Sequence, residues 1–378
     1  MLRSKLPPWL GPAALGAVAV GALLGLAAAW AYSSRIAAEL LDARPATVVP
    51  DVEVVEVGEG RIVLERTDET VADGRWGLAA ADAYGQVSSI ARITESTVER
   101  AFDALEGRIA PGDEVAVDLP AYPGDPARAH RLGFENVRVP GDLGPNPAWL
   151  VDGRRSTWVV VVHGREHGRR EALRLLPALV EQGFPVLVVS YRNDGTGTPG
   201  GAGVATWGLD EWRDVEAALA VAERKGAEAF VLVGFDAGAE IVASTLHRSR
   251  QTSKILGVIF DSPVLDLDDL ARDLQPWWAP GPVGALGRLL AEVRWSIDWR
   301  LLDQVRRAEE FDVPILVLHG DQDEIVPIDR VRAFVEARPD LVALVSFGKG
   351  RHGDLWNVDR VRYEASVTAF LAQVAGAE

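Results

Sequence analysis

The stretch Ala229-Phe-Val-Leu-Val-Gly-Phe-Asp-Ala-Gly238 decides the fold class. It begins as a short apolar run of the kind found in buried strands, and it ends in a turn that contains two glycines. A helical pattern follows directly, from Ala239 to Arg248. Because glycine leaves room where the backbone doubles back, this order predicts a tight strand–turn–helix elbow with Asp236 at its tip.

The chain around this elbow alternates between apolar runs and amphipathic segments. The other predicted strands are Trp158–Val162, Pro185–Ser190, Ile255–Phe260, Pro314–Leu318 and Leu341–Ser346. The predicted helices are Arg169–Glu181, Leu209–Lys225, Ala239–Arg248 and Arg360–Val374. This alternation predicts an α/β fold with a mostly parallel sheet flanked by helices. More than fifty residues separate Phe260 from Pro314, which is room for a helical lid at about 263–310.

Polar loops follow several of these strands. His163-Gly-Arg165 follows the first strand, His319-Gly-Asp-Gln-Asp-Glu-Ile-Val-Pro327 follows the fifth, and Gly348-Lys-Gly-Arg-His352 follows the sixth. Because the carboxyl ends of parallel strands meet at one edge of a sheet, we expect these loops to gather beside the elbow and form an active site there.

On these loops, residues 146–378 resemble an α/β-hydrolase of the serine-hydrolase superfamily. They are similar to membrane-anchored actinobacterial hydrolases related to serine aminopeptidases and acyl hydrolases. Further segments that carry the resemblance are Ser190-Tyr-Arg-Asn193, Glu211-Trp-Arg-Asp-Val-Glu-Ala-Ala218, Asp261-Ser-Pro-Val264 and Trp356-Asn-Val-Asp359. The resemblance implies hydrolysis of an ester, acyl or amide bond in a small-molecule, lipid-like or peptide substrate, without a cofactor.

The resemblance also assigns roles to residues. Asp236 stands at the nucleophile position, Asp323 at the position of the acid, and His352 at that of the general base. The backbone N–H groups of Ala237 and of a residue near Arg165 would form the oxyanion hole. Asp321 and Asp261 are alternatives for the acid.

The nucleophile position departs from the family pattern, because the family has serine where this chain has Asp236. A carboxylate attacks alkyl carbon well and ester carbonyls poorly. Three interpretations therefore stay open: a hydrolase with weakened activity, a non-catalytic binding or scaffold module, and an aspartate-nucleophile hydrolase of epoxides or haloalkanes. Against the last, Ala237 replaces the Trp of dehalogenases, and residues 263–310 contain no lid tyrosine.

Several other polar residues have simpler structural explanations. His163 and His319 are expected to shape their loops rather than to react. Asp266, Asp268 and Asp269 are expected to begin a helix, where acidic side chains favour the macrodipole, so we assign no metal site. The lid tryptophans Trp277, Trp278, Trp295 and Trp299 could line an apolar substrate pocket, pack the lid on the core, or contact a membrane.

The N-terminal segment Leu6–Tyr32 contains no charged residue and is long enough to cross a bilayer. Arg3 and Lys5 precede it, which favours a cytoplasmic N-terminus and an extracytoplasmic body in the cell membrane. A signal peptide cleaved near Ala29-Trp-Ala31 is the competing interpretation.

The predicted division is an anchor at 1–33, a mostly β accessory region at 34–145 with a helix at Thr94–Leu105, and the hydrolase domain at 146–378. The net charge of −16 argues against nucleic-acid binding, and the absence of cysteine excludes disulfides and thiol nucleophiles.

Overall fold

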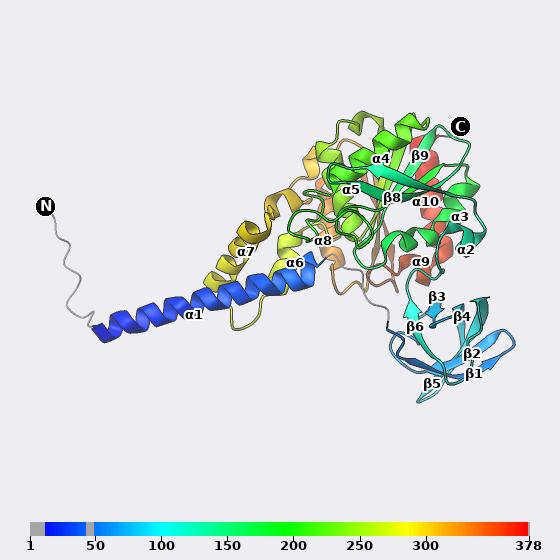
Figure 1. Ribbon diagram of the computed structural model, residues 1–378, viewed down its shortest axis with the longest axis horizontal. Coiled ribbons are helices and arrows are strands. Elements are labelled where there is room, and N and C mark those ends of the chain that lie inside the picture. The colour runs from blue at the N-terminus through cyan, green and yellow to red at the C-terminus, as the bar shows by residue number, and fades with distance from the viewer. Residues whose placement is uncertain (1–11, 43–48, 377–378) are drawn as a thin grey trace.

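The computed structural model describes residues 12–42 and 49–376, which form a central α/β body, a small β-barrel beside it, and a long helix that projects away (Figure 1). The segments Leu6–Gly11 and 43–48, which include part of the predicted anchor and of its link to the accessory region, lie outside the described residues.

The body contains one eight-stranded sheet in the order β14-β13-β12-β11-β9-β10-β8-β7. Its strands are β7 (Glu135–Pro140), β8 (Pro145–Val151), β9 (Thr157–Val162), β10 (Val186–Val189), β11 (Ala229–Phe235), β12 (Ile255–Asp261), β13 (Ile315–Gly320) and β14 (Val342–Phe347). The six strands from β9 onward are parallel, which confirms the predicted fold class.

Strands β7 and β8 form an antiparallel hairpin at the edge of this sheet. The Pro/Gly-rich turn between them, in which Pro140 is the partner of Pro145, therefore connects two strands of the body. The hydrogen-bonded sheet thus begins at Glu135, eleven residues before the position at which the sequence places the start of the hydrolase domain.

Helices cover both faces of the sheet, because alternate residues of each strand point to opposite sides. In β9, Val160 and Val162 join one buried cluster, whereas Val159 and Val161 join another. The first cluster is covered by α4 (Trp212–Arg224), α5 (Ala237–Arg248) and α8 (Ile328–Ala337). The second is covered by the 3₁₀ segment Gly168–Arg174, α3 (Leu176–Glu181), α9 (Leu355–Val358) and α10 (Arg360–Ala375).

The accessory region is a closed six-stranded barrel over residues 52–118. Its strands are β1 (Val52–Gly58), β2 (Arg61–Glu65), β3 (Trp76–Ala79), β4 (Tyr84–Ile93), β5 (Thr97–Glu106) and β6 (Glu114–Asp118), and the short helix α2 (Pro126–His130) follows it. The predicted helix at Thr94–Leu105 is wrong. That stretch contains good helix formers, but Val98, Arg100 and Phe102 point into the barrel at every second position, as a strand requires.

The lid between β12 and β13 is helical, as expected, with α6 (Leu267–Asp273), α7 (Gly281–Trp295) and short 3₁₀ turns at Trp299–Leu302 and Ala308–Glu310. Helix α1 (Pro12–Ile36) lies against α7 and continues into a π-helical turn, Ala37–Leu41, of which Leu40 and Leu41 are buried. We call α1, α7 and the loop 274–280 the arm; Figure 1 shows it projecting from the body.

Candidate active site

Asp236 occupies the tip of the elbow between β11 and α5. Its backbone lies in a positive-φ conformation (φ 46°, ψ −118°) that residues other than glycine rarely adopt. The flanking glycines are required by space. A Cβ atom at Gly234 would lie 2.5 Å from the Cα of Ala239, and one at Gly238 would lie 2.2 Å from the carbonyl oxygen of Val162. The turn is therefore as tight as the sequence pattern predicts.

The loops after β13 and β14 bring an acid and a histidine to this tip. His352 Nε2 lies 3.2 Å from Asp236 Oδ1, and His352 Nδ1 lies 2.8 Å from Asp323 Oδ2. Asp323 is buried, and its other oxygen accepts hydrogen bonds from the backbone N–H groups of Ile325 and Val326. These bonds fix the carboxylate that orients the histidine.

The two alternative acids lie elsewhere. Asp261 is buried, and it accepts hydrogen bonds from Tyr363 (2.7 Å) and Ser262 (2.9 Å). Asp321 is exposed at the start of the loop. Within the part of the chain that the structure describes, the carboxylates that contact His352 are those of Asp236 and Asp323.

The second oxygen of Asp236 points toward the expected oxyanion hole. The backbone N–H of Arg165 donates to Asp236 Oδ2 at 3.4 Å, and a backbone hydrogen bond from Ala237 also favours the charged carboxylate. The guanidinium of Arg165 adds a longer contact, with Nε 4.0 Å from Oδ2. The carboxylate thus bridges the predicted oxyanion donors and the histidine.

This bridge determines the charges at the site. Burial alone would raise the pKa of Asp236, but the hydrogen bond from His352, the charges of His352 and Arg165, and the bond from Ala237 outweigh it and lower that pKa to about 2. Burial likewise opposes protonation of His352, yet Asp236 and Asp323 together raise its pKa to about 10. At neutral pH, the site is therefore an imidazolium held between two carboxylates.

A buried ion pair that the sequence analysis missed supports both loops. Glu171 Oε2 accepts a hydrogen bond from Gly164 N at 2.7 Å and so holds the loop of Arg165. Arg174 contacts Glu171 and donates to the carbonyl oxygen of Gly353 (2.8 Å), next to His352. Burial raises the pKa of Glu171 to about 7, although the charge of Arg174 opposes the shift. The only signal in the sequence is the i, i+3 spacing of opposite charges, which surface helices also show.

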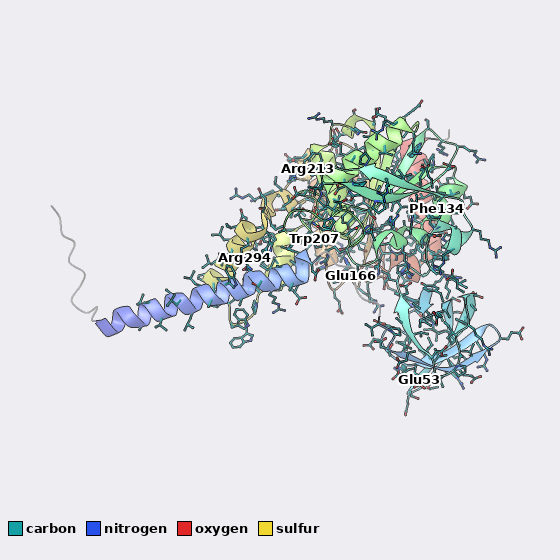
Figure 2. The ribbon with its side chains drawn as sticks, in the orientation of Figure 1. Glu53, Phe134, Glu166, Trp207, Arg213 and Arg294 are labelled. Carbon is teal, nitrogen blue, oxygen red and sulfur yellow. The ribbon has the colours of Figure 1, made fainter. Side chains whose placement is uncertain are left out.

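The end of the N-terminal helix also reaches the site. Arg165 Nη1 donates to the carbonyl oxygens of Glu39 and Leu40, each at 3.2 Å. Trp207 Nε1 donates to Leu40 O at 2.8 Å, and the Arg165 guanidinium lies 4.7 Å from the Trp207 ring centroid. Figure 2 shows Trp207 near the end of α1 that meets the body.

The remaining polar candidates have structural partners. His163 is buried between Gly164 O and Asp194 (3.0 Å), and His319 Nε2 lies 2.8 Å from Val326 O. Asp266 caps α6 by accepting hydrogen bonds from two backbone N–H groups. Among the lid tryptophans, Trp299 is buried, Trp295 is half-buried, and Trp277 and Trp278 are exposed.

Two family models match the chain. The α/β hydrolase fold model matches residues 157–312, which run from β9 through the elbow into the lid. A family described as a domain of unknown function (DUF8805) matches residues 53–118, which form the barrel.

Solved structures share the fold. The Pyrococcus furiosus esterase Pf2001 has a TM-score of 0.55 and 18% identity, with 68% of this chain and 98% of the esterase covered. A puromycin hydrolase variant has a TM-score of 0.54 and 22% identity, with 88% of this chain covered; the chain spans about half (53%) of that protein. Together with the sheet order, these matches show that the body of this chain has the α/β-hydrolase fold.

Proposed function

We propose that this protein is a membrane-anchored α/β-hydrolase for ester, acyl or amide bonds whose activity is held low by Asp236. The observation that carries the proposal is the bridge formed by the Asp236 carboxylate, which contacts both His352 Nε2 and the backbone N–H of Arg165. One side chain thereby occupies the place of the nucleophile and the place of the developing oxyanion.

The chemistry of this bridge disfavours attack on a carbonyl. A general base must be unprotonated, and His352 has a pKa of about 10 beside its two carboxylates. An oxyanion formed from substrate would compete with Asp236 for the same donors. If Asp236 attacked an ester carbonyl, the product would be a reactive anhydride that reverts. A non-catalytic binding module is the limiting case of this proposal, in which no substrate displaces the carboxylate.

A second candidate is an aspartate-nucleophile hydrolase that acts on alkyl carbon. The low pKa of Asp236, about 2, favours it, because the carboxylate is ionised and lies beside a histidine. Attack by Asp236 at an epoxide or haloalkane carbon would break the C–O or C–halogen bond, release an alkoxide or a halide, and form an alkyl ester. Water would then hydrolyse that ester to the alcohol and restore the Asp236 carboxylate. A leaving group needs a donor on the opposite side, and Ala237 supplies no side-chain donor there.

The anchor part of the proposal rests on α1. The described helical segment Gly16–Leu41 is long and apolar enough to cross a membrane. We assign residues 1–33 to a single-pass anchor. Because the sheet of the body begins at Glu135, we assign 34–134 to an accessory region and 135–378 to the hydrolase domain, with the body outside the cytoplasm. Cleavage after Ala31 would separate Ala29 from the buried Tyr32, although both pack on α7, so we favour an uncleaved anchor.

The decisive experiment replaces Asp236 by Ser in the full chain. Serine removes the charge and supplies a hydroxyl beside His352, so hydrolysis of short p-nitrophenyl esters should rise at least tenfold. Asp236→Ala is the matched control: it removes the same charge without a nucleophile and should give no such gain. If the unaltered protein cleaves an epoxide or haloalkane and Asp236→Ser abolishes that activity, the second candidate is correct and the first fails.

A further inference from the structure

We propose that the tip of the lid, residues 274–287, inserts into the lipid bilayer beside α1, so that the protein contacts the membrane through two segments. The inference rests on the anchor assigned above and extends it to a part of the hydrolase domain. The occupant of this surface is the acyl-chain region of the leaflet nearest the body.

The composition of the tip fits this environment. No charged residue occurs between Asp273 and Arg288, and the stretch contains Trp277 and Trp278. The side chain of Trp277 is 93% exposed and that of Trp278 is 40% exposed. Tryptophan is enriched at membrane–water interfaces, where its ring has apolar surroundings and its N–H remains hydrated. In water, by contrast, this exposed apolar surface would be unfavourable.

The contact between α1 and α7 has the character of a contact between membrane helices. The residues of α7 that are buried against the rest of the arm are small: Gly284, Gly287 and Ala291. A Cβ atom at Gly287 would lie 2.4 Å from Tyr32 Cδ1 and 3.1 Å from the carbonyl oxygen of Ala29. Small residues allow close approach of helices in lipid, where no hydrophobic effect drives them together.

Tyr32 and Ile36 of α1 are buried, but other large apolar residues of the arm point outward. Leu23 and Leu24 on α1, and Leu289 and Val293 on α7, are each more than half exposed. An amphipathic helix in water has the reverse arrangement, with its large apolar residues against its neighbour. The outward-facing residues continue the apolar surface of α1 onto α7.

The direction of α7 places its N-terminal end in the bilayer. Arg294, near its C-terminal end, lies over the ring of Trp30 and donates to Ser33 and Ser34, whereas Gly287 lies beside Ala29 and Tyr32. Figure 1 shows the start of α7 farther from the body than its end, and Figure 2 shows Arg294 beside α1.

The membrane boundary follows from the charges on α1. Within Pro12–Ile36 the first charged side chain is Arg35, and Trp30 and Tyr32 precede it, as expected at an interface. At a rise of about 1.5 Å per residue, the seven positions from Gly287 to Arg294 extend about 10 Å along α7. The loop that contains Trp277 precedes α7 and therefore lies on the hydrocarbon side of Arg294.

The one charge within this part of α7 is neutralised inside the protein. Arg288 Nε lies 2.9 Å from Asp268 Oδ1, and the Arg288 side chain is only 19% exposed. The exposed charge Glu292 lies one turn closer to the body, level with Arg294. The charges of α7 thus lie either in an internal pair or near the boundary.

The absence of cysteine from the sequence permits a direct test in the full-length protein. Single cysteines at Ala285 (α7), Val20 (α1) and Ala104 (barrel), each exposed, are labelled with the fluorophore NBD. The variants are reconstituted into phosphatidylcholine/phosphatidylglycerol vesicles with or without bromine on the acyl chains. We expect brominated lipid to quench the labels at Val20 and Ala285 at least twofold, and the label at Ala104 by less than a tenth.

The outcomes separate the two proposals. Quenching at Val20 without quenching at Ala285 would overturn the insertion of the lid and leave the anchor intact. No quenching at either position would overturn both. Quenching at Ala285 alone would support insertion of the lid and contradict a membrane-spanning α1. Circular dichroism of each variant, compared with the cysteine-free chain, shows whether it has folded.

Discussion

The elbow and the arm differ in the kinds of contact that hold them: charged side chains pair at the elbow, whereas small residues pack in the arm. At the elbow, His352 lies between two carboxylates, and Arg174 and Glu171 tie the neighbouring loops together. In the arm, the closest contacts are those of small residues, such as Gly287 against Tyr32, and large apolar side chains face outward. The charges at the elbow are largely buried and are paired with protein partners, whereas the arm has surface that protein does not cover. The elbow is thus complete within the chain, whereas we propose that the bilayer covers the arm.

The largest expected effect tests whether the elbow works as a triad once serine is present. In the Asp236→Ser background, Asp323→Asn should lower kcat/KM for p-nitrophenyl esters by about 10³–10⁴-fold, because the acid fixes the orientation and tautomer of the histidine. Asp321→Asn, at the exposed alternative acid, is the matched control and should change kcat/KM less than twofold. Equal losses from both variants would contradict the assignment of Asp323.

The second test concerns the charge of His352. Because Asp236 contributes to the raised pKa of His352, Asp236→Ser should lower that pKa by about one unit or more, or about 1.4 kcal/mol per unit. NMR titration of the histidine side chains, with His352→Gln to assign the resonance, measures this shift. An unchanged pKa would show that Asp236 does not interact with the imidazolium.

The same interaction makes stability depend on pH. The pKa of His352 is raised on folding, so its stabilising contribution is complete below the ordinary value of about 6.5 and is lost as pH rises through 10. The free energy of unfolding of the unaltered chain should therefore fall between these pH values. Urea titrations should show a smaller fall for Asp236→Ser, and equal slopes would contradict the ionic model of the elbow.

A further test concerns Asn357, which connects the barrel to the loops that hold the elbow. The side chain of Asn357 is buried, donates to the carbonyl oxygens of Arg75 (2.7 Å) and Leu119 (3.0 Å), and accepts from Arg174 (2.8 Å). Asn357→Ala leaves these groups without that partner and should reduce the free energy of unfolding by about 1–3 kcal/mol. Asn136→Ala, on the exposed face of β7, should change it by less than about 0.5 kcal/mol in the same urea titration. Equal effects would show that the hydrogen bonds of Asn357 contribute nothing to the free energy of unfolding.

The sequence was sufficient to predict the structure where interactions between near neighbours along the chain determine it. The strand ends and their loops could be predicted because most of the apolar runs stop at a polar residue or a glycine, as at His163, Gly234 and Asp261. The parallel arrangement of the strands then brings these ends to one edge of the sheet. The helix expected at Thr94–Leu105 is a strand because the guanidinium of Arg100 is buried, where carbonyl oxygens of Ser88, Thr70, Ala72 and Gly74 accept its hydrogen bonds. The sequence alone does not distinguish a buried arginine from an exposed one.

Contacts between segments that are distant in the sequence account for the features that the sequence did not predict. The packing of α7 on α1 joins positions about 255 residues apart, and neither segment contains a pattern that identifies the other as its partner. The role of Arg174 likewise depends on Gly353, which the fold alone brings near. The bridge from Asp236 to the Arg165 N–H could not be predicted either, because it depends on the rotamer of one side chain in a strained turn.

The smallest expected effect tests the close contact within the arm. Replacing glycine by alanine inside a helix normally stabilises it, by up to about 1 kcal/mol. At Gly287, however, the new methyl group would meet the ring of Tyr32, which cannot easily move because its hydroxyl donates to the carbonyl oxygen of Ala271 at 2.5 Å. The collision should outweigh the gain in helix propensity, so Gly287→Ala should lower the Tm in detergent micelles by about 2 °C. Gly281→Ala is the matched control, because a Cβ atom there meets nothing within 4 Å, and it should leave the Tm unchanged or slightly raised. If the two variants shift the Tm alike, α7 does not pack on α1 in the folded protein, and the arm loses the contact that ties the lid to the anchor.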